Sequence, residues 1–391
     1  MESTIPLAKY LAREGVEIDL YCLLPQSGQN TYVFDFLKNP QPNGFVDANI
    51  TKETLGKKLC QYLSGTQLKN FIIPDGRYDR LFLKDLYSAY KFARHLKKKK
   101  YDLIHIIHSS RRFWLFLYFF IPKRKIIQTL HEVTSHDGES DPLDLLPLKW
   151  LIKNATPVIF HSNISKNRFI EFRESISTKR ISDAPLALIR FGLFETYHYF
   201  NTNLHPVKNK EINILNFGRI VPSKGIHLLI DAVRLLQDKY PIHLTVAGDG
   251  KPYFDFKGIK NYEFINRFIP NEEIVSLIED CDIVVIPYTS ASQSGIPMTV
   301  YAFNKPIIAS NIAGLKEVID NQKTGILVDN ISASSLAASI ESLLSDTNLR
   351  NEMAENIKKK YTAGEFSWPH IAKQTLSFYS KQLEGNKDIK K

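Results

Sequence analysis

Cysteine is scarce in this sequence, with three residues in 391, namely Cys22, Cys60 and Cys281. They are scattered and lack the paired spacing of zinc ligands or of a disulfide framework, which excludes both kinds of scaffold. We therefore expect three buried, apolar thiols in a protein of a reducing compartment.

Long hydrophobic runs are absent as well. The most apolar stretch, 113–121, lies between clusters of Lys and Arg and falls far short of the roughly 20 residues that span a bilayer. Its pattern predicts a buried helix, with contact to a membrane as the alternative. The N-terminus is polar and amphipathic, so we expect no signal peptide.

Acidic residues are outnumbered, because 51 Lys and Arg stand against 41 Asp and Glu and give a net charge of +10. Such a surplus suits nucleic acid, an anionic membrane or phosphate-bearing substrates. No zinc-finger spacing or RNA-recognition motif is present, which argues against nucleic acid. We expect a cytoplasmic enzyme, peripheral on the inner face of the cytoplasmic membrane, with the lysine runs at 97–100 and 358–360 on solvated helix faces.

Strand-like and helix-like segments alternate through both halves, which predicts parallel α/β sheets. In the first half we expect strands at 16–22, 102–107, 125–130, 157–160 and 187–189. Helices are expected there at 5–13, 85–98 and 113–120, with an irregular excursion from about 25 to 75. In the second half we expect strands at 212–216, 243–247, 262–265, 282–286, 306–310 and 325–328.

The length favours two domains. We predict two Rossmann-like, doubly wound α/β domains that face each other across a cleft, where ligands of such folds bind. The first would cover 1–200 and the second 210–365, and a C-terminal helix in 366–391 would pack back on the first. Doubly wound domains usually open with a strand and a Gly-rich turn, whereas this chain opens with a helix. We expect that first strand to lie upstream of this sequence or to be missing, with a later strand filling its place as the alternative.

The loop at 217–225 is the most informative segment. It follows a predicted strand, contains Gly218, Arg219 and Lys224, and opens into a predicted helix near Ile226. A helix N-terminus offers unpaired N–H groups and partial positive charge, and Arg and Lys side chains both bind phosphate oxygens. The loop therefore suits a diphosphate. An ordinary turn with two solvated cations is the alternative.

Seven segments of the second half follow one another in a familiar order: 216–225, 246–250, 264–270, 282–288, 294–297, 305–310 and 314–318. Together they resemble glycosyltransferase family 4, retaining enzymes of the GT-B fold that use nucleotide-sugar donors. In the first half the resemblance rests on 129–139 and 160–162. It implies transfer of a hexose or related sugar from a UDP- or GDP-linked donor to a glycan or lipid-linked acceptor. Surface polysaccharide or lipopolysaccharide biosynthesis would be the setting.

The resemblance also implies site residues. Arg219 and Lys224 would hold the donor diphosphate and stabilise the departing nucleotide, and His131 would lie near the donor sugar as a third catalytic residue, unless it only caps a strand end. His136 and Glu139 would contact the acceptor, whereas His161 and His105 are expected to be structural. Donor binding is assigned to Gly218, Arg219, Lys224, Asn266, Arg267, Phe268, Ser294, Gly295, Ile296 and Thr299.

One departure from the family bears on activity. Two glutamates that the family often carries just before the segment 305–310 correspond here to Ala291 and Thr299. Thr299 would offer a hydroxyl and Gln293 an amide instead. No Asp-x-Asp loop is present, so we expect no metal ion and no cofactor besides the donor.

Three functional hypotheses remain after these observations. The first is a glycosyltransferase, and the second is a non-catalytic nucleotide-sugar-binding pseudo-glycosyltransferase. The third is another GT-B chemistry, such as an epimerase or a phosphorylase. The sequence lacks a pyridoxal-phosphate lysine motif, which argues against a phosphorylase.

Overall fold

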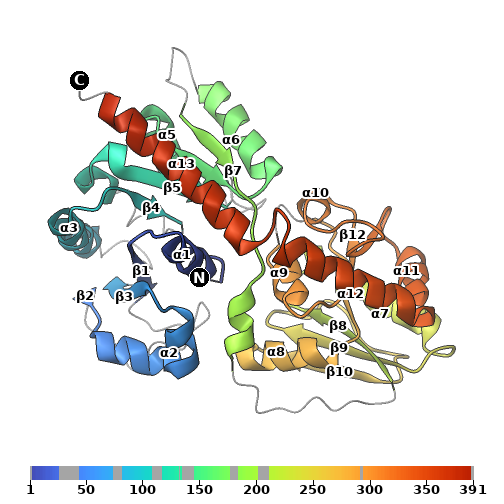
Figure 1. Cartoon of the computed structure of the whole chain (residues 1–391). Helices are drawn as coiled ribbons and strands as arrows, with labels where there is room; N and C mark the ends of the chain where they lie inside the picture. Colours follow the sequence, from blue (N-terminus) through green and yellow to red (C-terminus); the bar gives the residue numbers. More distant parts are fainter. Residues whose placement is uncertain are drawn as a thin grey trace. The chain divides into compact units, whose positions relative to one another are not determined.

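The computed structural model describes residues 2–25, 44–73, 82–107, 117–131, 133, 145–176, 184–200, 211–290 and 294–388. The chain divides into two compact units (Figure 1). Unit 1 comprises Met1–Phe191 and Trp368–Lys391, and unit 2 comprises Gly192–Ser367. The chain thus passes from unit 1 to unit 2 after residue 191 and returns after residue 367, whereas the boundaries expected from the sequence lay at 200–210 and 365–366.

Unit 2 is built on a six-stranded sheet in the order β10-β9-β8-β11-β12-β13. All neighbouring strands in it are parallel. Its strands are β8 (Ile212–Phe217), β9 (Ile242–Gly248), β10 (Tyr262–Asn266), β11 (Ile283–Ile286), β12 (Ile307–Ser310) and β13 (Gly325–Val328). The six strands predicted for the second half are confirmed. Strand order reverses between β8 and β11, and a reversal of this kind marks the ligand end of doubly wound sheets.

Helices complete unit 2, and the main ones pack on the sheet through apolar stripes. In α7, Ile226, Leu229, Ile230 and Val233 share one face and join the buried cluster that contains strand and α11 residues. Burying one such side chain contributes about 1.5–3 kcal/mol. The helical segments are η3 (Glu195–Tyr199), η4 (Pro222–Lys224), α7 (Ile226–Leu236), α8 (Asn271–Asp280), α9 (Ile296–Tyr301), α10 (Ala313–Lys316), α11 (Ala333–Ser345) and α12 (Thr347–Thr362).

Unit 1 contains a four-stranded parallel sheet in the order β4-β5-β6-β7. Its strands are β4 (Ile104–Ile106), β5 (Ile126–Leu130), β6 (Val158–Phe160) and β7 (Leu186–Leu188), as predicted apart from their ends. The unit also contains α3 (Phe82–Lys99), η1 (Lys123–Lys125), α5 (Leu145–Lys153) and α6 (Asn163–Ile176). Of the helix predicted at 113–120, residues 117–120 are helical and 113–116 lie outside the described residues.

The prediction of an irregular segment from 25 to 75 was wrong for its described part, residues 44–73. A second sheet, in the order β1-β3-β2, is formed by β1 (Ile18–Pro25), β2 (Gly44–Phe45) and β3 (Thr66–Ile73), with α2 (Ala48–Tyr62) before β3. The strands β1 and β3 pair in parallel along their full lengths, whereas β2 is antiparallel to β3. Residues 26–43 lie outside the described part of the chain.

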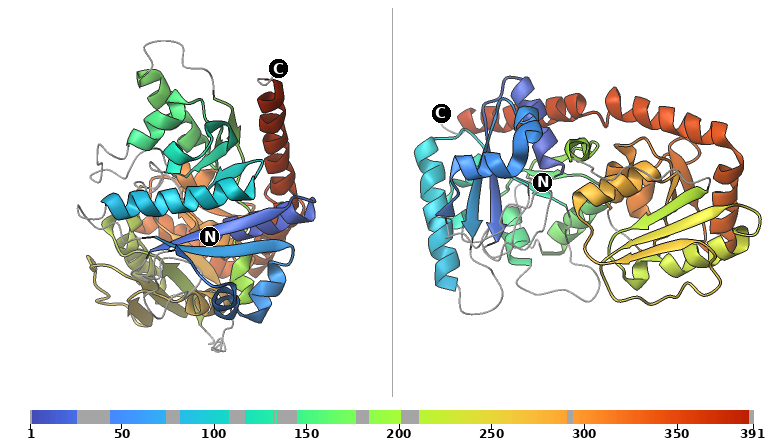
Figure 2. Two further views of the ribbon diagram at one scale, coloured as in Figure 1. Left: turned by 90° about the vertical axis from the view of Figure 1, so that its left-hand side faces the viewer. Right: turned by 90° about the horizontal axis from the view of Figure 1, so that it is seen from below.

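The first and last helices lie together in unit 1 (Figures 1 and 2). The first element is α1 (Thr4–Arg13), which confirms the helix predicted at 5–13, and β1 follows it at an edge of its sheet. The last is α13 (Trp368–Asp388), whose Trp368 stacks on Tyr10 with ring centroids 6.5 Å apart. Trp368 also joins a buried cluster with Ile127 of β5 and Ile159 of β6. The apolar start of α13 thus covers the four-stranded sheet.

Candidate functional site

The loop after β8 is held by its backbone against the loop after β9. The Gly218 N–H donates to the Ala247 carbonyl at 2.9 Å, and the Ile220 N–H donates to the Asp249 carbonyl at 2.9 Å. A Cβ at Gly248 would overlap the Gly218 carbonyl oxygen, so only glycine permits this approach. The parallel ladder thus extends past both strands and fixes Arg219 at the carboxyl edge of the sheet.

The short helix η4 is fixed against the end of β11. Its last residue is followed by Gly225, whose φ of 63° lies in the left-handed region and whose Cβ would overlap the Pro287 carbonyl oxygen. The Thr289 N–H donates to the Ser223 carbonyl at 2.9 Å. These contacts bring Lys224 to the strand end that carries Tyr288.

Lys224 and Arg219 lie close together without a carboxylate. The Lys224 Nζ sits 3.6 Å from the centroid of the Tyr288 ring, which is itself buried. Burial, and secondarily the charge of Arg219, lower the pKa of Lys224 to about 8. Among the residues that the structure describes, no ion pair joins either side chain to an acid. Two neighbouring cations of this kind form a site for an anion.

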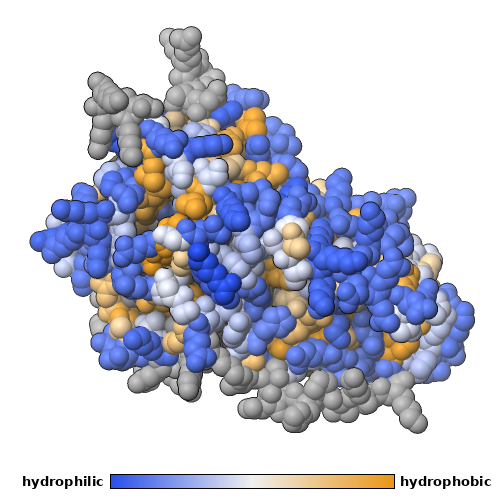
Figure 3. All heavy atoms as spheres, viewed as in Figure 1, coloured by the Kyte–Doolittle hydropathy of each residue, from blue (hydrophilic) through white to orange (hydrophobic). Residues whose placement is uncertain are grey.

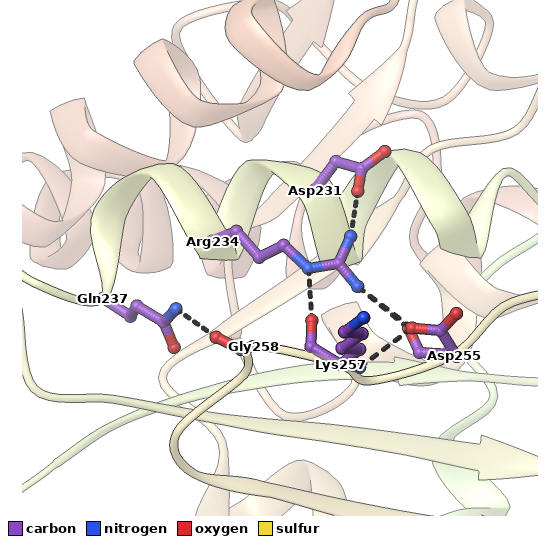
Figure 4. A network of polar contacts seen from close by, with 6 residues as sticks. All are labelled: Asp231, Arg234, Gln237, Asp255, Lys257 and Gly258. Carbon is purple, nitrogen blue, oxygen red and sulfur yellow. Dashed lines mark hydrogen bonds and ion pairs between the residues drawn. The ribbon is translucent and has the colours of Figure 1, made fainter.

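The N-terminus of α7 is less open than the sequence predicted. The Ile226 N–H donates to the Tyr253 hydroxyl at 3.0 Å, so this expected phosphate donor is already engaged. The loop that carries Tyr253 is fixed to α7 by Arg234, which donates to the carbonyls of Lys257 and Asp255 at 2.9 and 3.1 Å and also pairs with Asp231 (Figure 4). The free donors of this loop are therefore its side chains more than the N–H groups of the helix end.

The start of α9 holds the next group of predicted donor-binding residues. Ser294 Oγ accepts a 3.4 Å hydrogen bond from the Ile296 N–H, and Gly295 is exposed and borders the Phe194 ring. Thr299 is buried, and its hydroxyl donates to the Gly295 carbonyl at 3.4 Å. In this structure the Thr299 hydroxyl thus bonds within its own helix. Ala291 and Gln293 lie outside the described residues.

Three successive side chains at the end of β10 make different contacts. When its amide is oriented to satisfy its neighbours, Asn266 donates to the carbonyls of Gly248 and Gly250 at 3.3 and 3.1 Å. Arg267 makes a two-pronged ion pair with Glu273, with distances of 2.8 and 2.7 Å. The Phe268 ring is 59% exposed. Of the three, Phe268 presents an exposed ring, whereas Asn266 supports the β9 loop.

In unit 1, His131 stands at the carboxyl end of β5 within a group of rings. Its ring lies 5.6 Å from Phe191 and 5.1 Å from His161, centroid to centroid, and Phe191 stacks on His161 at 3.9 Å. The His131 Nε2 donates to the Ile107 carbonyl at 3.1 Å. The Ser165 hydroxyl of α6 donates to the His131 carbonyl at 2.8 Å. His136 and Glu139, the predicted acceptor contacts, lie outside the described residues.

His161 and His105 are held in structural hydrogen bonds, as predicted. His161 Nδ1 donates to the Ile189 carbonyl at 2.6 Å, and burial lowers its pKa to about 4. His105 lies between Tyr379 and Thr129, at 2.6 and 2.7 Å, and burial lowers its pKa to about 3. Both rings line a cavity of about 20 Å³ between α1, α13 and the sheet, roughly the space for one water molecule. Both are neutral near pH 7.

Two residues of the site were missed by the sequence reasoning, Tyr288 and Phe191. Tyr288 lies two residues after the buried strand β11, and Phe191 lies three residues after the half-buried strand β7, so each stands near the carboxyl edge of its own sheet. The available signal was an aromatic residue after an apolar run, as in the sequence from Ile283 through Pro287 to Tyr288. That signal identifies the edge of the sheet but not the side chain that the aromatic ring contacts, because the contacting side chains come from other loops.

Comparison with known proteins agrees with this geometry. A family model described as Glycosyltransferase Family 4 matches residues 3–182, and one described as Glycosyl transferases group 1 matches residues 201–360. The chain belongs to glycosyltransferase family 4. The two models cover unit 1 and unit 2 in turn, which confirms the resemblance found in both halves of the sequence.

Individual relatives of the family are distant. The uncharacterized glycosyltransferase MJ1607 of Methanocaldococcus jannaschii is 28% identical over 184 residues, which are 46% of this chain and 47% of that protein. The capsular polysaccharide biosynthesis glycosyltransferase CapM of Staphylococcus aureus is 26% identical over 252 residues, 59% of this chain and 64% of CapM. The chain thus matches about half to two thirds of the length of these curated relatives.

A solved structure shows the fold. HepE from Anabaena, in complex with UDP and glucose, is similar with a TM-score of 0.61 at 18% identity, over 97% of this chain and 95% of HepE. The predicted GT-B architecture of two Rossmann-like domains is therefore confirmed. Within the described part of the chain, no helix combines the length and the apolar character that crossing a membrane requires.

Proposed function

We propose that this chain is a retaining glycosyltransferase that moves a sugar from a UDP- or GDP-linked donor to a glycan or lipid-linked acceptor. The pairing of Arg219 with Lys224 beside Tyr288, without a carboxylate, is the observation that carries this proposal. The HepE complex contains UDP and glucose, which supports a nucleotide-sugar donor. CapM is named for capsular polysaccharide biosynthesis, which supports surface polysaccharide assembly as the setting, and lipopolysaccharide assembly stays a prediction.

The chemistry follows from where charge develops. Transfer breaks the bond between the anomeric carbon of the sugar and an oxygen of the terminal phosphate, and that oxygen gains negative charge. An acceptor hydroxyl forms the new bond to the same carbon on the side that the nucleotide leaves, and its proton passes to the departing phosphate oxygen. Arg219 and Lys224, fixed before the reaction, stabilise the charge where it appears. Each charge-assisted hydrogen bond contributes about 1.5–3 kcal/mol.

Two further features belong to the same proposal. We assign the positive charge that a divalent metal often supplies to Arg219 and Lys224, so transfer proceeds without a metal ion or another cofactor. We also assign His131 to the donor sugar, as the family resemblance implies, and within unit 1 its ring is held by Ile107 and Phe191. The three free cysteines support a reducing, cytoplasmic setting. Peripheral contact with an anionic membrane stays a prediction here, because net charge alone does not identify a surface.

A transfer assay tests the proposal. The purified chain is screened against UDP- and GDP-sugars, and release of free nucleotide is measured with and without acceptor. Arg219→Ala and Lys224→Ala are expected to lower turnover by about 10²–10³-fold each, as removal of one fixed donor to a developing charge does. Lys358→Ala, which removes an exposed lysine of α12, is the matched control and keeps full activity. Full activity in both site variants would refute the assignment.

A specific observation favours one alternative, a non-catalytic nucleotide-sugar-binding protein. The family's glutamates are replaced by Ala291 and Thr299, and the Thr299 hydroxyl bonds to the Gly295 carbonyl. Calorimetry with UDP and GDP separates the two functions when it is run beside the transfer assay. Nucleotide binding without turnover on any donor would favour the alternative. His131→Ala adds a second criterion, because it should lower turnover while leaving nucleotide affinity unchanged.

A further inference from the structure

The helix α3 exposes large apolar side chains on its outer face. Its inner face is buried through residues such as Ala89 and Phe92. On the outer face, Leu83, Tyr87 and Tyr90 are 76%, 66% and 46% exposed. Spacings of four and three residues place these three side chains in one stripe along the helix. Burial within unit 1 does not explain them.

The same stripe becomes basic toward the end of the helix. Arg94, Lys97 and Lys98 continue the spacing and are exposed. The 18 residues of α3 include six Lys or Arg and one acid, Asp85, which is buried. Figure 2 (left) shows α3 running across the outer surface of unit 1, and Figure 3 shows hydrophilic residues gathered at the left edge, where α3 lies in Figure 1. The outer face of α3 therefore offers positive charge without an exposed carboxylate.

The segment 119–124, which contacts α3, also exposes aromatic and basic side chains. Phe119 is 72% exposed, and the next residue, Phe120, contacts Tyr90 edge to face with centroids 5.5 Å apart. Lys123 and Arg124 follow and are exposed. Two segments distant in sequence thus place exposed aromatic and basic side chains next to one another.

We propose that this surface docks on an anionic lipid bilayer. The α3 face is defined as Leu83, Tyr87, Tyr90, Arg94, Lys97, Lys98 and Phe119. Leu and Phe side chains enter the acyl boundary, tyrosines lie at the interface, and long basic side chains reach lipid phosphates. Exposed apolar residues rimmed by positive charge are complementary to such a surface. The inference names a surface for the peripheral membrane contact predicted above, and it is tested separately from sugar transfer because docking needs none.

A second lysine-rich helix shows why charge alone does not define this surface. The helix α12 carries Lys358 and Lys359 on its exposed side, but its sequence also contains Glu352 and Glu355. Over its full length, all of which the structure describes, α12 exposes no large hydrophobic side chain. It is therefore a solvated face, and it supplies a matched control for α3.

Vesicle flotation of the full chain tests the proposal. Vesicles of phosphatidylcholine alone are compared with vesicles that also contain phosphatidylglycerol, at low and high salt. The wild type should bind the anionic vesicles, and high salt should weaken binding because it screens the charges. The triple substitutions Leu83→Ser/Tyr87→Ser/Tyr90→Ser and Arg94→Glu/Lys97→Glu/Lys98→Glu should each lower vesicle affinity about tenfold or more.

Matched controls make the result specific. Leu235→Ser removes a leucine of α7 that is 62% exposed, and Lys358→Glu/Lys359→Glu reverses the charges of α12, and both should bind vesicles like the wild type. Equal binding of the two vesicle types, or equal losses in the controls, would overturn the proposal. Tighter binding to RNA than to vesicles would also overturn it, if the Arg94→Glu/Lys97→Glu/Lys98→Glu variant lost that RNA binding and the Leu83→Ser/Tyr87→Ser/Tyr90→Ser variant kept it.

Calorimetry with UDP on the same proteins separates this proposal from the proposed function. All of these variants should keep wild-type UDP affinity, which also shows that they are folded. A chain that floats with vesicles but binds no nucleotide would refute the donor site and leave the docking surface standing. A chain that binds UDP but no vesicle would refute the docking surface and leave the donor site standing.

Discussion

Lys224 should make nucleotide affinity fall as the pH rises through about 8. Burial and the nearby Arg219 lower its pKa to about 8 in the ligand-free protein. A bound diphosphate favours the charged form and raises that pKa. Below pH 8, Lys224 is protonated both with and without ligand, so it adds no pH dependence. Above pH 8 the free protein has lost this proton, binding must take one up, and affinity declines.

The size of the effect follows from one proton. Affinity should fall by about tenfold per pH unit between the free and the bound pKa of Lys224. A Lys224→Met variant loses this slope. Near neutral pH its affinity should be lower by roughly tenfold to 150-fold, which corresponds to the ~1.5–3 kcal/mol of a charge-assisted hydrogen bond.

Titration calorimetry with UDP from about pH 7.5 to 9.5 measures this slope, because the terminal phosphate, with a pKa of about 6, is fully ionised there. Lys224→Arg is the control, since a guanidinium stays charged across this range and should give a nearly flat profile. Buffers with different ionisation enthalpies count the proton directly. A flat wild-type profile, or an equal slope in Lys224→Arg, would refute the assignment of Lys224 to the phosphate.

Three further predictions concern stability and metal. Gly225→Ala should destabilise the chain by more than about 2 kcal/mol in urea unfolding, because a left-handed backbone and the Pro287 carbonyl both oppose a Cβ. Gly258 has a φ of 81° and open space around it, so Gly258→Ala should lose only the stability that the left-handed backbone costs. Equal losses of unfolding free energy in the two variants would contradict the clash at Gly225. The melting temperature should fall as the pH drops below about 6.5, because His105 and His161 are buried neutral, with pKa values of about 3 and 4, and unfolding lets them take up protons. His105→Gln should flatten this pH profile, and an unchanged slope would contradict the contribution of His105 to it. Finally, EDTA should leave the rate of transfer unchanged, and loss of activity restored by added metal would contradict the proposed role of the two cations.

Strands were predictable from sequence wherever they are buried on both faces. Runs such as 283–286 are continuously apolar, and a parallel strand covered by helices on both sides requires this composition. In β3 (Thr66–Ile73), polar and apolar residues mix from Thr66 to Asn70, and α2 has few apolar residues. Both were missed because β3 is stabilised by pairing with β1 and α2 lies against β3, and these tertiary contacts decide the structure more than local composition does.

The candidate site was predictable where one loop carries it. Arg219 and Lys224 lie in a single turn between a strand and a helix, so local sequence was sufficient to associate them with phosphate. The Tyr288 ring under Lys224 comes from the end of β11, and the Tyr253 hydroxyl at the start of α7 comes from the loop after β9. Such partners depend on how strand ends converge, which no local pattern encodes.

A crystal structure of the chain with UDP tests the central claim most directly. The account predicts the diphosphate at the carboxyl edge of the six-stranded sheet, with phosphate oxygens within hydrogen-bond distance of both the Arg219 guanidinium and the Lys224 ammonium. A well-ordered UDP whose phosphates touch neither side chain would contradict it.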